Sequence, residues 1–299
     1  MPRPQPNVLR PLAVALLSLV ALAAAGSTAS AVDLQAADLD PGGWAMDPAS
    51  GRVFASDYGG KRVVEFDPVT GRPAREFQLS AEHPRDLVVK KGKLVVAVES
   101  GVAVHVIDLA TNQVEGRVQL AGRGPSHLFC SEADNPWVYA VCNTGDAWWD
   151  GEVFQVDVLA RRSRKSVKVQ GWRQSAVRQV AMAPDGRSCV VTGFHSPSRA
   201  DLMTVDEEAM TFRDVFGYHE SFGPIRPHPT GRFWTFGNAL YSQDIRKRIR
   251  EYRGSVLAAH PSLDLVAGLR AGGLGRAGGL VVTLQTFGGP EVLSDVTLA

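Results

Sequence analysis

Basic side chains recur in this chain at intervals of about forty-five residues, a spacing typical of repeated supersecondary units. If the fold brings them together, their guanidinium and imidazole groups can hold an anionic ligand through charge-assisted hydrogen bonds. The plainer interpretation is structural, because Asp86 and backbone carbonyls can satisfy the same groups. The first candidate ligand-binding group consists of Arg85, Asp86, His127, Arg178, Gln179 and Arg226.

Two adjacent tryptophans belong to a second candidate group. Trp148 and Trp149 stand between Asp146 and Asp150 in a segment without strand periodicity, so we expect them in a loop. Two large apolar rings are costly to leave in water, and they can simply cover an edge of the fold. They can also form a stacking platform for a sugar or an apolar partner. With His195 in another predicted loop, they form the second candidate ligand-binding group.

The sequence lacks the common motifs of catalysis and metal binding. It has no Cys-x-x-Cys or His-x-His pair, no Gly-x-Ser-x-Gly elbow, no His-Glu-x-x-His and no phosphate-binding glycine loop. His195, His219, His228 and His260 fall in different repeats, and spacing pairs none of them with a carboxylate, so we expect solvated or hydrogen-bonded histidines. The sequence therefore predicts no catalytic residue, no metal site and no cofactor.

The elements that must position the candidate residues are short strands in repeated units. Each unit opens with a strand whose apolar residues stand two apart, as in Trp44 and Met46, and a second strand follows after a tight turn. Six such units are visible, with first strands near 43–48, 86–91, 127–132, 179–184, 224–229 and 256–261. This period predicts an all-β fold, a β-propeller of six four-stranded blades. The number of blades stays open between six and seven, because residues 32–40 could supply a further strand that closes the ring.

The two ends of each predicted blade differ in their loops. First-to-second and third-to-fourth turns lie at one end, here named the turn end, and the third strands close there on aspartates such as Asp67 and Asp108, which are expected to accept backbone N–H bonds. The second-to-third loops and the segments between blades lie at the opposite end, named the link end. Longer segments at 143–151, 194–200, 217–223 and 271–279 fall there. Because binding residues concentrate on the variable loops of a rigid scaffold, the link end is the predicted binding face.

The repeats resemble those of the secreted propellers with YVTN-type repeats, a group related to the WD40 proteins. The resemblance rests on residues 47–57, 104–112 and 118–127 and covers the chain well from Trp44 to about Asp206. The fifth unit is compressed, and the sixth holds a glycine-rich stretch where a short loop is usual. The resemblance implies a propeller and says little about activity, because this fold hosts binding scaffolds and several unrelated enzymes.

The N-terminal segment predicts export. Residues 1–31 combine Arg3 and Arg10, an apolar run and the small residues Ala29-Ser30-Ala31, which is the layout of a secretory signal peptide. The apolar run is shorter than the roughly twenty residues that span a bilayer, which disfavours a membrane anchor. We expect cleavage near Val32, a propeller domain over 32–299, a secreted or periplasmic location and no stable membrane insertion after cleavage.

Charge and cysteine content narrow the function. The chain has 32 Lys and Arg against 31 Asp and Glu, so no global field favours nucleic acid as a partner. Its three cysteines are an odd number, and Cys130 and Cys142 fall too far apart on a predicted hairpin for a disulfide, which favours buried thiols.

Together these patterns favour an exported, non-catalytic propeller scaffold that binds a protein, peptide or glycan on its loop-rich link end. The alternative is a propeller hydrolase or lactonase that acts on a small anionic substrate in a central channel. The first candidate group would lie at the mouth of that channel, where Arg85, His127, Arg178 and Arg226 would orient the substrate. An inward-facing acid–base pair or a set of metal ligands would favour this enzyme. A third possibility is a sensory or stalk module of a larger assembly.

Overall fold

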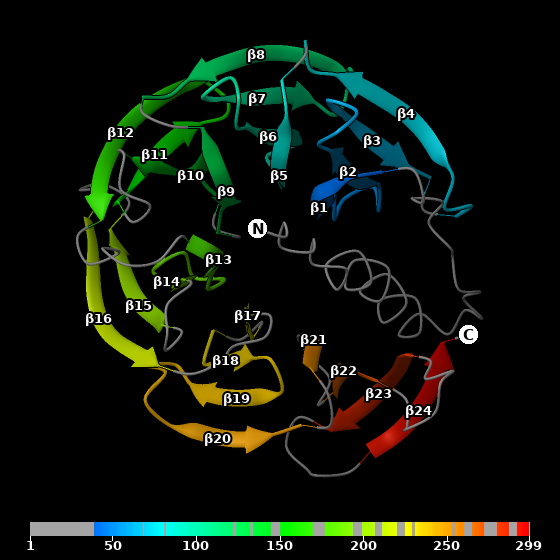
Figure 1. The fold of residues 1–299 in the computed structure, drawn as a ribbon, viewed down its shortest axis with the longest axis vertical. Coiled ribbons are helices and arrows are strands. Elements are labelled where there is room, and N and C mark those ends of the chain that lie inside the picture. The colour runs from blue at the N-terminus through cyan, green and yellow to red at the C-terminus, as the bar shows by residue number, and fades with distance from the viewer. Residues whose placement is uncertain are drawn as a thin grey trace, which may run out of the picture. The chain divides into compact units, whose positions relative to one another are not determined.

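The computed structural model describes most of the chain after its N-terminal segment and consists of strands and turns (Figure 1). The described residues are 39–67, 69–80, 82–121, 124–131, 134–144, 150–169, 177–193, 199–206, 211–219, 225–228, 231–252, 255–259, 265–271, 280–286 and 292–298. They fall into two compact units. No helix in this part of the chain has the length and apolarity of a membrane span.

The first unit contains three four-stranded antiparallel sheets, here named A, B and C. Sheet A consists of β1 (Pro41–Met46), β2 (Val53–Asp57), β3 (Arg62–Phe66) and β4 (Pro73–Gln78). Sheet B consists of β5 (Pro84–Lys90), β6 (Lys93–Val98), β7 (Ala103–Asp108) and β8 (Gln113–Gln119). Sheet C consists of β9 (Pro125–Phe129), β10 (Trp137–Thr144), β11 (Asp150–Asp157) and β12 (Arg162–Val169). In each sheet the strands follow chain order, as Figure 1 shows.

The second unit repeats this arrangement in sheets D, E and F. Sheet D consists of β13 (Val177–Met182), β14 (Ser188–Gly193), β15 (Arg199–Asp206) and β16 (Thr211–His219). Sheet E consists of β17 (Ile225–Pro227), β18 (Phe233–Phe236), β19 (Ala239–Ser242) and β20 (Arg248–Glu251). Sheet F consists of β21 (Ser255–Ala259), β22 (Leu265–Ala271), β23 (Leu280–Thr286) and β24 (Val292–Leu298). The predicted all-β class with four-stranded units is thereby confirmed.

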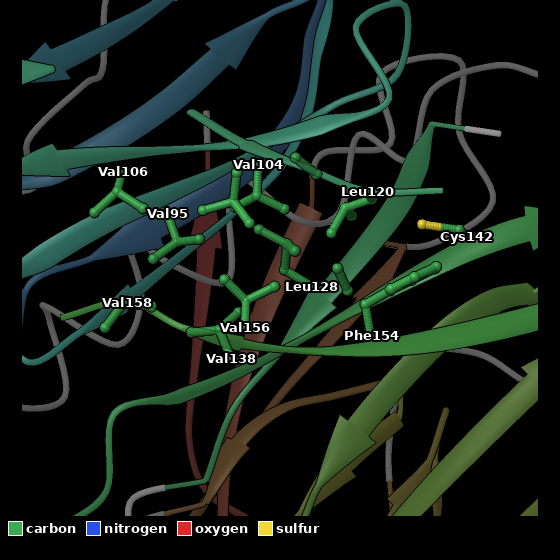
Figure 2. Close-up of a cluster of buried hydrophobic side chains, with 13 residues drawn as sticks. Val95, Val104, Val106, Leu120, Leu128, Val138, Cys142, Phe154, Val156 and Val158 are labelled. Carbon is green, nitrogen blue, oxygen red and sulfur yellow. The ribbon is translucent and has the colours of Figure 1, made fainter. Parts of the chain in front are cut away.

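Neighbouring sheets of the first unit pack through apolar faces. The first strands β1, β5 and β9 lie next to one another in chain order, and the outer strands β8 and β12 also meet. Between sheets B and C, valines of β6 and β7 interleave with residues of β9, β10 and β11 (Figure 2). Val95, Val104 and Val138 are fully buried there, and burying one such side chain stabilises the fold by about 2 kcal/mol. This core fixes sheets B and C as a rigid support for their loops.

The first strand of sheet A is packed on both faces, although the sequence pattern of apolar residues two apart marks only one of them. Trp44 and Met46 pack with Phe66 on one face, and the Trp44 and Phe66 rings stack with centroids 5.7 Å apart. Ala45, which points the other way, is 7% exposed and belongs to the core shared with sheet B. When both faces of a strand are buried, its sequence does not alternate between apolar and polar residues.

A β-bulge recurs between the third and fourth strands of all six described sheets. In each case one extra residue of the fourth strand falls between two paired positions, at the same place in the repeat. The extra residues are Ala74, Glu115, Arg164, Val215, Ile249 and Leu293. A bulge bends its strand and increases the local twist. The repeat is therefore conserved in backbone geometry even where the side chains differ.

Candidate functional site

All residues of the first candidate group lie on first strands, as the alignment of the repeats predicts. Arg85 and Asp86 are on β5, His127 is on β9, Arg178 and Gln179 are on β13, and Arg226 is on β17. The side chains of Arg178 and Gln179 lie outside the described part of the structure. Arg226 belongs to the second unit and is described there by itself. The geometry of the group can therefore be built from its members in the first unit.

Arg85 is held by an acid and an aromatic ring at the link end. Its Nε donates to Glu99 Oε2 at 2.8 Å, and its guanidinium lies 4.7 Å from the centre of the Tyr58 ring. The Tyr58 hydroxyl donates to the same Glu99 oxygen at 3.2 Å. Burial alone would lower the pKa of Arg85, but the hydrogen bond and charge of Glu99 outweigh it and raise the pKa. Arg85 is thus charged and oriented while its side chain remains 45% exposed.

His83 completes this arrangement from the segment that joins sheets A and B. Its ring stacks on Tyr58 with centroids 4.6 Å apart, and its Nδ1 lies 2.9 Å from the Tyr58 carbonyl oxygen. Its backbone N–H donates to Ser100 Oγ at 3.0 Å. Tyr58, His83, Arg85 and Glu99 form what we name the link-end cluster. It combines two aromatic rings with an ion pair, all drawn from loops and strand ends of two neighbouring sheets.

Sequence reasoning found Arg85 but missed the other members of the link-end cluster. Tyr58 directly follows β2 and Glu99 directly follows β6, so the two residues occupy the same position in successive units. Extending the repeat alignment by one column beyond the second strand would have placed them together. Nothing in the sequence indicates His83, because its contact with Tyr58 depends on how sheets A and B pack.

Asp86 has a structural role. It is 7% exposed, and its Oδ1 accepts the Leu87 amide at 3.0 Å while its Oδ2 accepts the Leu128 amide of β9 at 2.9 Å. A Cβ at Gly43 of β1 would lie 2.7 Å from Asp86 Oδ1, so only glycine fits this close approach. Asp86 therefore joins the first strands of sheets B and C beneath β1. It supports the Arg85 backbone next to it.

His127 and Arg226 make short-range contacts. His127 is half-buried, and its Nδ1 lies 2.9 Å from Ser126 Oγ. Arg226 is also half-buried, and its Nη1 donates to the Ile225 carbonyl at 2.7 Å. Within the first unit, Asp86 accepts the Leu128 amide and so contacts β9, the strand that also carries His127. The structure places Arg85 with Glu99 and Tyr58 instead.

A second polar group lies deeper at the link end of sheet B. Glu82 accepts from Arg117 Nη2 at 2.9 Å and contacts the Nε2 of His105, which is 6% exposed. Burial alone would raise the pKa of Glu82, but the hydrogen bonds from Arg117 and His105 leave it below its ordinary value. Among the described residues, His105 Nδ1 has no hydrogen-bond partner. This carboxylate–histidine pair joins the segment before β5 to β7 and β8.

Carboxylates at the turn end bind their own turns. Asp67 Oδ1 accepts the amides of Val69 and Thr70 at 2.9 and 2.7 Å, and these backbone bonds lower the pKa of Asp67. Asp108 and Asp157 accept the amides of the corresponding turns in sheets B and C. The prediction that these aspartates form turns is confirmed.

The second candidate group, Trp148, Trp149 and His195, lies outside the described residues. Within the part that is described, no group of three or more His, Cys, Asp or Glu side chains is arranged to hold a metal ion. The three cysteines form no disulfide. Cys142 and Cys189 are buried, and burial raises the pKa of each thiol to about 12, whereas Cys130 is half-buried.

Comparison with known proteins gives a fold and no family. No family model matches the chain, and no curated protein matches it either. Hydrazine synthase of Kuenenia stuttgartiensis has a similar structure, with a TM-score of 0.61 over 87% of this chain and 80% of that chain, at 16% sequence identity. The likeness shows the fold alone. Many other solved chains are also similar, so this all-β architecture of four-stranded sheets is a common one.

Proposed function

We propose that this chain is an exported β-propeller scaffold that binds a protein, peptide or glycan at its link end and carries out no catalysis. In this proposal residues 1–31 are a cleaved signal peptide, residues 32–299 form the propeller of the YVTN type, and the six sheets are its blades. Support comes from six sheets of identical strand order and from the bulge that recurs in each of them.

The link-end cluster is the observation that carries the proposed binding role. Tyrosine and arginine are enriched among residues that dominate binding energies at interfaces. Here Tyr58 is held between partners, and the Arg85 and Glu99 side chains remain 45% and 40% exposed. Because these groups are already ordered by one another, a ligand would lose little side-chain entropy on contacting them.

A binding screen with matched variants tests this proposal. The purified full chain is probed with arrays of glycans and peptides, and each hit is titrated against the double variant Tyr58→Ala/Arg85→Ala. We expect the double variant to bind at least about tenfold more weakly, since truncating central interface residues commonly costs more than about 1 kcal/mol each. The control variant Val69→Ser/Arg72→Ala, exposed at the turn end, should bind as the wild type does. Ligands that bind the control variant more weakly, but bind the Tyr58→Ala/Arg85→Ala variant as they bind the wild type, would overturn the proposal.

The enzyme alternative needs a proton-transferring group that a substrate can reach. The Glu82–His105 pair has suitable chemistry, but His105 is 6% exposed and lies on a third strand. This position suits packing between strands better than contact with a substrate. The binding scaffold therefore remains the proposal.

Export has a separate test. Fractionation of cells that express the full chain, followed by mass measurement of the product, should find a protein that begins near Val32 outside the cytoplasm. A full-length product retained in the cytoplasm would contradict export and leave the binding proposal standing.

A further inference from the structure

Cations concentrate on β12, the outer strand of sheet C. Residues 161–168 contain no Asp or Glu and five basic residues, namely Arg161, Arg162, Arg164, Lys165 and Lys168. The whole chain has a formal net charge of only +1. This strand therefore carries a local excess that the composition as a whole does not.

The equivalent strands of the same unit are balanced. β4 pairs Arg75 with Glu76 in sequence, and β8 has Glu115 and Arg117. All three strands are the outer strands of their sheets and all contain the bulge. A few charges protect an exposed edge against chance pairing. Because β4 and β8 need no such excess, edge protection alone does not explain the charge of β12.

Two basic side chains of β12, those of Arg162 and Arg164, belong to the described part of the structure, and both face solvent. Arg162 and Arg164 are exposed, and Arg162 makes no salt bridge with any side chain that the structure describes. Asp157, the partner of Arg162 across the sheet, uses its Oδ1 to accept the amides of Leu159 and Ala160 at 3.0 and 2.8 Å. The neighbouring strand β11 carries Asp150, Glu152 and Asp157 against the four basic residues of β12, so a net positive charge remains at this edge.

Two contacts fix the shape of this edge. The Arg161 Nη1 donates to the Glu115 carbonyl of β8 at 3.4 Å, which ties the start of β12 to the neighbouring sheet. The bulge residue Arg164 lies 4.8 Å from the centre of the Trp137 ring, and its Nη1 is 3.5 Å from Gln155 Oε1. Arg164 is therefore oriented by an aromatic face and an amide while it stays exposed.

The geometry points to β12 as the docking edge for an acidic, extended peptide segment that pairs with it as a fifth strand. In the sheet order, β12 is an end strand, so one row of its backbone groups pairs with no strand of the described sheets, although β8 of the neighbouring sheet meets it. Arg162 and Lys165 stand opposite Asp157 and Gln155 on one face, and Lys168 stands opposite Glu152 on the other.

An extended peptide matches this pattern in two ways. Its side chains alternate between the two faces of the sheet, so acidic residues at odd or at even positions of the peptide would stand beside a basic residue of β12. Its backbone can also hydrogen-bond to the edge of the sheet. Lipid headgroups or anionic polysaccharides would meet the charges but could not use the backbone. A second copy of β12 would be repelled by its like charges. This surface is separate from the link-end cluster, so the inference goes beyond the proposed function.

Peptide titration tests the inference directly. A fluorescent peptide of about ten residues that alternates Glu with Val is titrated with the purified full chain. Two control peptides of the same length are titrated beside it. One alternates Lys with Val, and the other is acidic but has Pro at every third position, so that it cannot pair as a strand. We expect binding of the Glu-Val peptide only, and slower hydrogen exchange of β12 amides in its presence. Inorganic polyphosphate serves as the polyanion without a peptide backbone.

Charge variants supply the specificity control. Arg162→Glu/Lys165→Glu should weaken binding by at least about tenfold, because two attractions become repulsions, whereas Arg72→Glu/Arg75→Glu in sheet A should leave it unchanged. Arg162→Gln/Lys165→Gln, a milder change, covers the case in which the first variant does not fold. Equal binding of the proline peptide or of polyphosphate would overturn strand pairing. If the wild-type protein is monomeric and does not bind the Glu-Val peptide, the inference is wrong and the charges of β12 serve only to protect the edge.

Discussion

Several carboxylates at the turn end and the link end of the first unit differ in how far along the chain their partners lie. At the turn end, Asp67 and Asp157 accept amides that lie two and three residues further along the chain. At the link end, Asp86 accepts an amide 42 residues away, and Glu99 binds the hydroxyl of Tyr58, 41 residues away. Asp67 and Asp157 are therefore satisfied by local sequence, whereas these contacts of Asp86 and Glu99 form only when neighbouring sheets pack together.

This difference explains why a repeat fold can vary at one end without losing its shape. The short turns after the third strands repeat the same local contacts in sheets A, B and C, and these contacts hold the strands in register. The contacts at the link end join different sheets, so they can be exchanged for others as long as the core remains. If so, substitutions at the link end should lower the free energy of unfolding more than substitutions at the turn end.

The largest effect is expected at Asp86. Replacing Asp86 by Ala removes two hydrogen bonds to a buried carboxylate and leaves the Leu128 amide without this acceptor. We expect a loss of about 3 kcal/mol in the free energy of unfolding, measured by urea titration of the tryptophan fluorescence. Asp86→Asn, which keeps an acceptor oxygen, should lose less. A loss below about 0.5 kcal/mol for Asp86→Ala would show that β5 and β9 do not depend on this bridge.

The second effect concerns the backbone at the link end. A Cβ at Gly124, in the segment that leads into β9, would overlap the Glu99 carbonyl. Because a backbone atom cannot rotate away, Gly124→Ala should destabilise the protein by about 2 kcal/mol, as overpacking does elsewhere. Gly92→Ala is the matched control at the turn end, where no atom lies within 4 Å but φ is +68°. The control should lose about 1 kcal/mol through strain alone, and an equal loss in both variants would remove the contrast.

The third effect is a pH dependence that belongs to the link end. The pKa of Glu82 is lowered in the folded protein from its ordinary value of 4.5, so its stabilisation is complete above that value and is lost as the pH falls through the folded pKa. Near pH 6, Glu82→Gln should be less stable than the wild type by about 1 kcal/mol. The gap should narrow in urea titrations as the pH falls below 4.5, because the unfolded chain then takes up the proton first.

Arg117→Gln sharpens this test, because it removes one of the two groups that lower the pKa of Glu82. In that background, substitution of Glu82 should cost less at about pH 6, where Glu82 is ionised. A gap between wild type and Glu82→Gln that stays constant from pH 6 to pH 3, within about 0.2 kcal/mol, would contradict ionisation as the source of the effect.

The smallest effect is expected at the turn end. Asp157→Ala removes the acceptor for the Leu159 and Ala160 amides, but solvent can replace it there. We expect a loss of about 0.5 kcal/mol, obtained from the same urea titrations. A loss as large as that of Asp86→Ala would mean that the two ends contribute equally and that sequence range does not predict energy.

The sequence predicts the repeated part of this fold well. Apolar residues two apart and a tight turn predict a second strand after each first strand, and β2 and β18 follow β1 and β17 in this way. The turn aspartates follow from the same local chemistry. These features depend on neighbours within one strand and turn, where residue preferences act directly.

The candidate site was only partly predictable. Arg85 follows from the repeat, but its partner Glu99 and the stacking of Tyr58 on His83 depend on contacts between sheets. Asp86 was grouped with the ligand-binding candidates, whereas the structure uses it to join β5 and β9. A charged residue at the start of a strand has the same sequence signature in both roles, and only the packing of the next sheet separates them.

The recurring bulge has a practical consequence for protein engineering. Six different residue types, from Ala74 to Arg164, occupy the extra position, so the backbone there accepts almost any side chain. The position is exposed at Ala74, Arg164 and Ile249. A designer could therefore place an affinity handle, a spectroscopic probe or an unnatural amino acid at this point of successive sheets. The repeats would then serve as an addressable array, spaced by the fold itself.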